Sequence, residues 1–105
     1  MASRPIKGLI VTTDGRVLDT VFQTLEDFQK AVDGYIELIR LQRYAMYVNE
    51  DGLLRGLPVN PISVLCGFRV VGNVALVGHA VNGKVTQLST AIINEIKEIF
   101  ANEEV

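Results

Sequence analysis

Four arginines and all three tyrosines of this 105-residue chain lie between positions 35 and 69. Arginine binds phosphate or carboxylate groups with paired hydrogen bonds, and the tyrosine ring stacks on planar groups. This mixture is typical of a surface that binds a small nucleotide-like anion or an acidic patch of a protein. The residues that we expect on such a surface are Tyr35, Arg40, Arg43, Tyr44, Tyr47 and Arg55. The alternative is that the arginines are solvent-facing strand ends and that the tyrosines pack half-buried.

The same region holds four further polar candidates, which are Glu37, Asn49, Glu50 and Asn60. Glu37 falls within an apolar run, so it needs a partner if it faces the interior, and Arg40, Arg55 or the Asn49 amide is available. The asparagines and Glu50 lie in turn-like sequence, where such side chains bind the backbone. The four residues therefore form either a structural polar network or part of a ligand site.

The sequence offers little for covalent or metal chemistry. His79 and Cys66 are the only histidine and cysteine, which excludes a histidine-rich metal site and a disulfide within the chain. Cys66 follows Val64 and Leu65 in a run that we expect in the core, where a free cysteine behaves as a small hydrophobic residue. We expect no catalytic residue, no metal site and no cofactor. A hydrolase or transferase that uses Glu37 and His79 is the alternative from a different class of function.

The composition indicates a single domain over residues 1–105, with a solvated tail at residues 102–105. Ten basic residues against twelve acidic ones give a net charge of -2, which argues against a nucleic-acid partner. No run approaches the roughly 20 apolar residues of a membrane span, and the start lacks a signal peptide, so we expect a cytoplasmic protein without membrane contact. The mean hydropathy of +0.28 is high for a small domain. We therefore expect a homo-oligomer, with a dimer favoured.

Apolar and β-branched runs predict strands at residues 6–12, 16–21, 35–41 and 44–48, and a β-rich stretch at residues 68–81. The first strand is apolar at successive positions, which predicts that both of its faces are covered. Gln42 and Arg43 suit a tight turn poorly, so we expect a wider loop there, whereas Asn82 and Gly83 predict a hairpin turn.

Three helices are predicted from capping residues and apolar spacing. Thr24 caps the first helix, whose apolar face contains Leu25, Phe28 and Val32, and Gly34 provides a left-handed end. A second helix of about two turns at residues 62–66 follows the cap Asn60.

Ser89 caps the third helix, and Leu88 packs on Ile93. Its buried stripe contains Ile92, Ile96, Ile99 and Phe100. The predicted order is β-β-α-β-β-α-β-(β)-α. Because strands and long helices do not alternate regularly, we expect an α+β fold, with a small, mostly antiparallel sheet and its two or three helices on one face.

Four segments are similar to motifs of a known family. They are Gly-Tyr-Ile-Glu at residues 34–37, Val-Asn-Glu-Asp-Gly-Leu at 48–53, Gly-Leu-Pro-Val-Asn at 56–60 and Val-Gly-Asn-Val at 71–74. Over almost its whole length the chain resembles a domain-of-unknown-function family of short uncharacterised proteins from bacteriophages, plasmids and other mobile elements. The resemblance implies a phage or mobile-element origin and an accessory role in the host cytoplasm, and it implies no enzymatic activity.

We therefore predict a non-enzymatic phage-type accessory protein that binds and sequesters or blocks a host component. That component is a host protein or, as the alternative, a small anionic nucleotide-like ligand; a purely structural oligomer is a further alternative. A deep pocket lined by the central arginines and tyrosines favours a small ligand. A flat apolar patch with an aromatic centre favours a protein partner.

Overall fold

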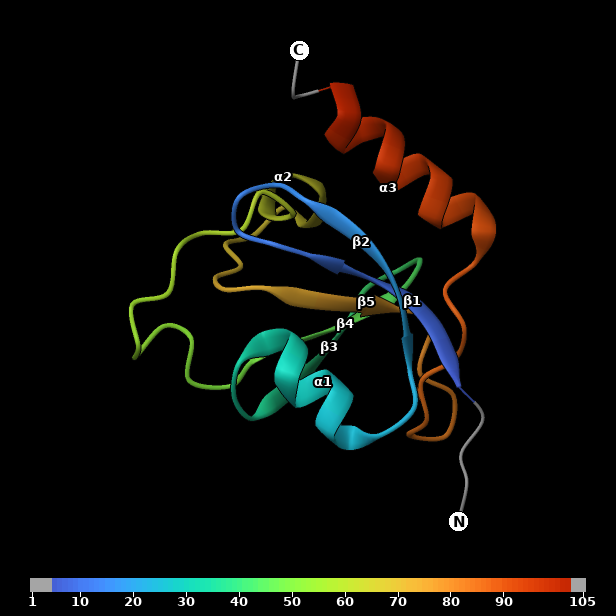
Figure 1. Cartoon of the computed structure of the whole chain (residues 1–105), viewed down its shortest axis with the longest axis horizontal. Coiled ribbons are helices and arrows are strands. Elements are labelled where there is room, and N and C mark those ends of the chain that lie inside the picture. The colour runs from blue at the N-terminus through green and yellow to red at the C-terminus, as the bar shows by residue number, and fades with distance from the viewer. Residues whose placement is uncertain (1–4, 103–105) are drawn as a thin grey trace.

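The computed structural model describes residues 5–102 of the chain. The elements are β1 (Ile6–Val11), β2 (Val17–Phe22), α1 (Leu25–Val32), β3 (Ile36–Arg40), β4 (Ala45–Asn49), α2 (Ser63–Cys66), β5 (Val74–Val77) and α3 (Thr90–Asn102) (Figure 1). The strands form one antiparallel sheet in the order β2-β1-β5-β4-β3. The predicted α+β fold is confirmed, and the predicted order of elements is confirmed through the fifth strand.

Helices cover both faces of the sheet, so the expectation of helices on one face is wrong. Phe28 and Val32 of α1 pack with Ala75 and Val77 of β5 on one face. On the other face, residues of α3 pack with Leu9, Met46 and Leu76, as well as with Ile62 beside α2 (Figure 1). Both faces are covered because apolar residues occupy alternating and successive positions in the central strands. The same pattern confirms the prediction for β1, whose Leu9 and Ile10 pack on opposite faces.

The first helix begins as predicted but ends differently. The Thr24 hydroxyl accepts a hydrogen bond from the Asp27 amide, and the Asp27 carboxylate accepts one from the Thr24 amide, which forms a capping box. Asp33, with a φ of 59°, is the left-handed residue at the helix end, so the assignment of that role to Gly34 is wrong. Leu25 is also exposed rather than buried, because the buried stripe of this short helix begins at Phe28.

Of the two predicted turns, the first is wider than two residues, as expected. β3 ends at Arg40 and β4 begins at Ala45, so residues 41–44 connect the two strands, and within them the Leu41 amide donates to the Tyr44 carbonyl. The Asn82–Gly83 turn forms, with positive φ at both residues, as a two-residue hairpin turn requires. It joins an isolated bridge between residues 81 and 84, however, and no further strand forms within the described part of the chain.

The second helix is a single turn, shorter than expected. Val64 and Leu65 are exposed and Cys66 is half-buried, so the expectation that this run lies in the core is wrong. The segment contains too few residues to bury one face of a regular helix between Pro61 and the left-handed Gly67.

The third helix confirms its prediction at the start. The Ser89 hydroxyl accepts a hydrogen bond from the Ile92 amide, and Leu88 and Ile93 belong to one buried cluster. Asn102 is the last residue of α3 rather than part of a tail. The rest of the predicted tail, residues 103–105, lies outside the described residues.

Candidate functional site

The structure does not bring the predicted binding residues together on one surface. Tyr44 packs on the α3 side of the sheet, whereas Tyr47 packs on the α1 side, where its ring centroid lies 4.5 Å from that of Phe28. Tyr35 is largely exposed, and Arg40 is exposed at the end of β3. Because side chains alternate between the faces of a strand, residues of both parities in β3 and β4 cannot form one surface.

The two candidate asparagines are buried and use their amides to hold the backbone. Asn49 Nδ2 donates to the carbonyls of Val32 and Asp33 at 3.0 and 3.1 Å, and Asn49 Oδ1 accepts from the Asp51 amide at 2.8 Å. Both N–H donors are thus used between the end of α1 and the turn after β4. The geometry supports the interpretation of Asn49 as part of a structural polar network.

Asn60 has the same role on the other side of the sheet. It is fully buried, and Asn60 Nδ2 donates to the carbonyls of Val11 and Gly72, each at 2.9 Å. Its Oδ1 accepts from the Ile62 amide at 2.9 Å, which fixes the chain ahead of α2. Among the residues that the structure describes, no buried side-chain nitrogen or oxygen lacks a hydrogen-bond partner.

Arg55 is engaged at the end of α1. Its Nη1 donates to the Asp33 carbonyl at 2.6 Å, and its Nη2 lies 3.2 Å from the Asp33 carboxylate. Gly34 is needed nearby because a Cβ atom there would lie 2.6 Å from Asn49 Nδ2. Gly34 also has a φ of 159°, a conformation that residues with a side chain rarely adopt, so the backbone and the close approach of Asn49 both select glycine here.

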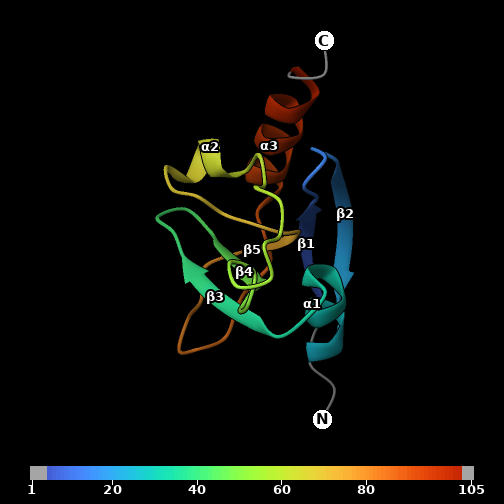
Figure 2. The same ribbon diagram turned by 90° about the vertical axis from the view of Figure 1, so that its left-hand side faces the viewer.

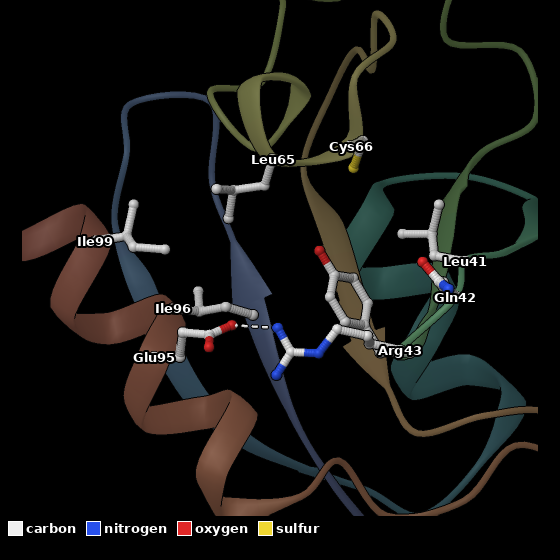
Figure 3. A pocket seen from close by; sticks show the side chains of 9 residues that line it. Leu41, Gln42, Arg43, Leu65, Cys66, Glu95, Ile96 and Ile99 are labelled. Atoms are coloured by element: carbon white, nitrogen blue, oxygen red, sulfur yellow. Dashed lines mark hydrogen bonds and ion pairs between the residues drawn. The ribbon is translucent and has the colours of Figure 1, made fainter.

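A cavity of about 300 Å³ lies between the β3–β4 turn, α2 and α3 (Figure 3). It is lined by Leu41, Gln42, Arg43, Tyr44, Leu65, Cys66, Glu95, Ile96 and Ile99. Arg43 Nη1 and Glu95 Oε2 lie 2.6 Å apart and connect the turn to α3. Of the predicted residues, this cavity contains only Arg43 and Tyr44, and sequence reasoning did not identify Glu95.

The Tyr44 phenol and the Cys66 thiol of this cavity remain protonated at neutral pH. Burial, followed by the nearby Cys66 thiol, raises the pKa of Tyr44 to about 12. Burial also raises the pKa of the Cys66 thiol. The hydrogen bond with Glu95 raises the pKa of Arg43 further above its ordinary value. Neither the phenol nor the thiol is therefore activated as a nucleophile or a base.

A second cavity of about 130 Å³ lies on the same face of β3, next to the first. Its lining residues are Glu37, Ile39, Val48, Asn49, Glu50, Leu53, Arg69, Val70 and Val71. Ile39 lines this cavity and Leu41 lines the larger one, and residues two apart in a strand lie on one face. The expectation of a buried partner for Glu37 does not apply, because its side chain is exposed.

Glu37 and His79 are not brought together. Glu37 is opposite Val48 in the β3–β4 ladder, near the start of β3. His79 is exposed beyond the end of β5, and its Nε2 lies 2.6 Å from the Gln42 carbonyl in the turn after β3. The two side chains therefore belong to opposite ends of that strand.

The most prominent exposed apolar residues lie between β4 and β5, where the sequence analysis singled out Glu50, Arg55 and Asn60 but none of the apolar side chains. They are Leu53, Leu54, Val59, Val64, Leu65 and Phe68, and we call them the 53–68 surface. Leu54 is 90% exposed and Val64 78%. A signal was present in the sequence, because Gly52, Gly56 and Gly67 with two prolines prevent a long regular element that would bury all of these side chains.

The fold and the site define a small α+β protein with two cavities of mixed apolar and polar lining. In its described part no three His, Cys, Asp or Glu side chains are grouped to hold a metal ion. Residues 6–101 match the family described as Domain of unknown function (DUF3846), and the chain therefore belongs to that family. No curated protein and no solved structure matches the chain. None of the helices within residues 5–102 has the length and apolar character that crossing a membrane requires.

Proposed function

We propose that this protein is a non-enzymatic accessory protein of a phage or other mobile element, which binds a host protein and blocks it. The observation that carries the proposal is the 53–68 surface, where six apolar side chains are exposed within sixteen residues. A small domain that exposes this many apolar side chains in one segment is expected to use them in protein interactions. Phe68 supplies an aromatic member, the residue class that is enriched in the centres of interfaces.

The two cavities extend this surface along β3. Leu53 lines the smaller cavity and Leu65 the larger one, so members of the 53–68 surface lie at both. Sites for small molecules enclose about 300–1,000 Å³. The 130 Å³ cavity is smaller than that, and the 300 Å³ cavity only reaches the lower end of the range, so both suit single side chains of a partner better than a whole nucleotide. A protein partner therefore fits this region better than a small ligand.

The ion pairs of the two arginines in this region also favour a protein partner over an anionic ligand. Arg43 is paired with Glu95, and Arg55 is paired with Asp33. An anionic ligand would have to displace these carboxylates before it could bind either guanidinium group. The pKa shifts of Tyr44 and Cys66 keep both groups protonated, which provides no support for an enzymatic alternative.

The test is capture from host lysate by the immobilised full chain, followed by mass spectrometry of bound proteins and small molecules. The double variant L54S/V64S removes two of the most exposed members of the 53–68 surface. The matched control L25S/V81S changes two apolar residues of 60% and 57% exposure elsewhere. We expect one host protein to be captured by the wild type and the control and lost by L54S/V64S.

Three outcomes would overturn the proposal. Retention of the same host protein by L54S/V64S would show that the 53–68 surface is not the site. Loss upon reversal of Arg40, Arg43 and Arg55 to glutamate, with retention by L54S/V64S, would restore the arginine-rich surface that the sequence predicts. Capture of a small anion that exchanges with salt, without a protein, would support the ligand-binding alternative instead.

A further inference from the structure

The edge strand β2 has an open outer side. The sheet order places β2 at one margin and β3 at the other, and within residues 5–102 no strand pairs with the outer side of β2 (Figure 2). The Thr12 amide donates to the Arg16 carbonyl, so Arg16 directs its backbone groups toward the first strand. In an antiparallel ladder every second residue does so, and the even-numbered residues of β2 therefore bond to β1. By that alternation the N–H and C=O groups of Val17, Asp19 and Val21 point away from β1.

The edge at β2 is less protected against pairing than the edge at β3. Exposed charges discourage pairing at an edge, and β3 carries Glu37 and Arg40 within five residues. β2 carries Asp19 alone in six residues, and this carboxylate is paired with Lys97 of α3. The apolar residues Leu18 and Val21 are 42% and 54% exposed on the two faces of this strand.

We propose that β2 pairs antiparallel with β2 of a second copy of this chain, about a two-fold axis that passes between the two Thr20 residues. A two-fold interface uses the same surface twice, so the strand has to be complementary to itself. With Thr20 opposite Thr20, each Asp19 forms a hydrogen-bonded pair with Val21 of the second copy. Leu18 then lies opposite Phe22 and is covered on the α1 side of the joined sheet.

Two neighbouring registers of the pairing between the two β2 strands are less favourable. A shift that places Asp19 opposite Asp19 brings like charges together. A shift that places Val21 opposite Val21 requires Gln23 to join the ladder opposite Asp19, but the Gln23 amide already donates to the Asp27 carboxylate at 2.7 Å. Registers that pair odd with even positions are excluded, because the free backbone groups belong to odd positions only.

This dimer is independent of the proposed partner site. The 53–68 surface borders cavities on β3, and β3 lies at the margin opposite β2 (Figure 2). A dimer through β2 therefore leaves both copies of the 53–68 surface free. It also covers apolar area in a chain whose mean hydropathy of +0.28 is high for its size.

The register is tested by single cysteines in the full chain, in a background where Cys66 is replaced by serine. Residues at a non-hydrogen-bonded antiparallel pair have Cα atoms about 4.5 Å apart, which a disulfide can span. We expect T20C to form a cross-linked dimer under mild oxidation, and D19C and V21C to cross-link far more slowly. Faster cross-linking of D19C or V21C than of T20C would overturn the proposed register.

The dimer itself is tested by light scattering at micromolar concentrations. We expect the wild type to have twice the chain mass of 11.5 kDa and V21K to have the single mass. V81K adds the same charge at a residue of similar exposure outside β2 and should remain dimeric, and circular dichroism verifies that each variant is folded. A wild-type mass of 11.5 kDa, or a V21K variant that remains dimeric, would overturn the proposal.

Discussion

Replacement of Asn60 by alanine tests whether the motif asparagines hold the scaffold. Asn60 is fully buried and makes three hydrogen bonds, to the Val11 and Gly72 carbonyls and from the Ile62 amide. Each such bond contributes about 1 kcal/mol, so N60A should lower the free energy of unfolding by about 3 kcal/mol. The total stability of a small domain is about 5–15 kcal/mol, so the variant should still fold.

The assay is urea unfolding followed by far-ultraviolet circular dichroism. With a denaturant dependence of about 1–3 kcal/mol/M, the loss corresponds to a midpoint lower by about 1–3 M urea. Asn94, exposed in α3, provides the control, because N94A should change stability by less than about 0.5 kcal/mol. A loss below about 1 kcal/mol in N60A would refute the structural role derived from its hydrogen bonds.

The isosteric variant N60D separates the charge from the lost hydrogen bonds. A carboxyl at this buried position would face the two carbonyls, and burial would raise its folded-state pKa above its unfolded value of about 3.9. A raised folded pKa means that stability is lost as pH increases, because the folded state holds the proton more strongly. N60D should therefore be closer to the wild type at pH 4 than at pH 7.

Three further predictions follow from single contacts. G34A should lower the free energy of unfolding in urea by about 2 kcal/mol, because the new Cβ atom displaces the Asn49 amide from two carbonyls; an unchanged midpoint would show that this contact relaxes. Burial raises the pKa of Tyr44 to about 12 in the folded state, above an unfolded value of about 10. The stability that the neutral phenol contributes is therefore lost as pH rises from about 10 to about 12. Y44F, which has no phenol to ionise, should lose less stability than the wild type over the same pH range. R55A should cost less than about 1 kcal/mol in thermal or urea unfolding, because its ion pair with Asp33 is largely exposed, and a larger loss would contradict that reasoning.

The sequence predicts the parts of this fold that depend on local rules. The Thr24 capping box, the Ser89 cap and the Asn82–Gly83 turn each follow from a side chain that satisfies nearby backbone groups. The strands follow from β-branched apolar runs, because such runs bury well in a sheet. These features require no knowledge of which elements meet in space.

Features that depend on long-range contacts were predicted less well. Helices on both faces of the sheet follow from how α1 and α3 pack, and local sequence does not encode which face each helix meets. Gly34 suggested the left-handed end of the first helix, but Asp33 takes that role, and Gly34 instead makes room for the side chain of Asn49, fifteen residues away. Val64 and Leu65 suggested a helix in the core, although α2 is too short to bury them.

At the candidate site, too, long-range contacts decide what the local sequence does not indicate. Tyr44 and Tyr47 are close in sequence, but strand alternation places them on opposite faces. Composition therefore indicated a cluster of arginines and tyrosines that the fold separates. Glu95 joins Arg43 only because α3 packs beside the β3–β4 turn, and no spacing in the sequence indicates that pair.

The two proposals concern opposite margins of one sheet, and this separation has a functional consequence. Buried asparagines hold the centre of the molecule, so its edges and the 53–68 surface are available for contacts with other chains. A dimer through β2 presents two copies of the 53–68 surface, related by the two-fold axis. Such a dimer binds a partner that has two matching sites with avidity beyond that of either site alone. A monomeric partner is instead bound twice and independently, so stoichiometry distinguishes the two kinds of partner.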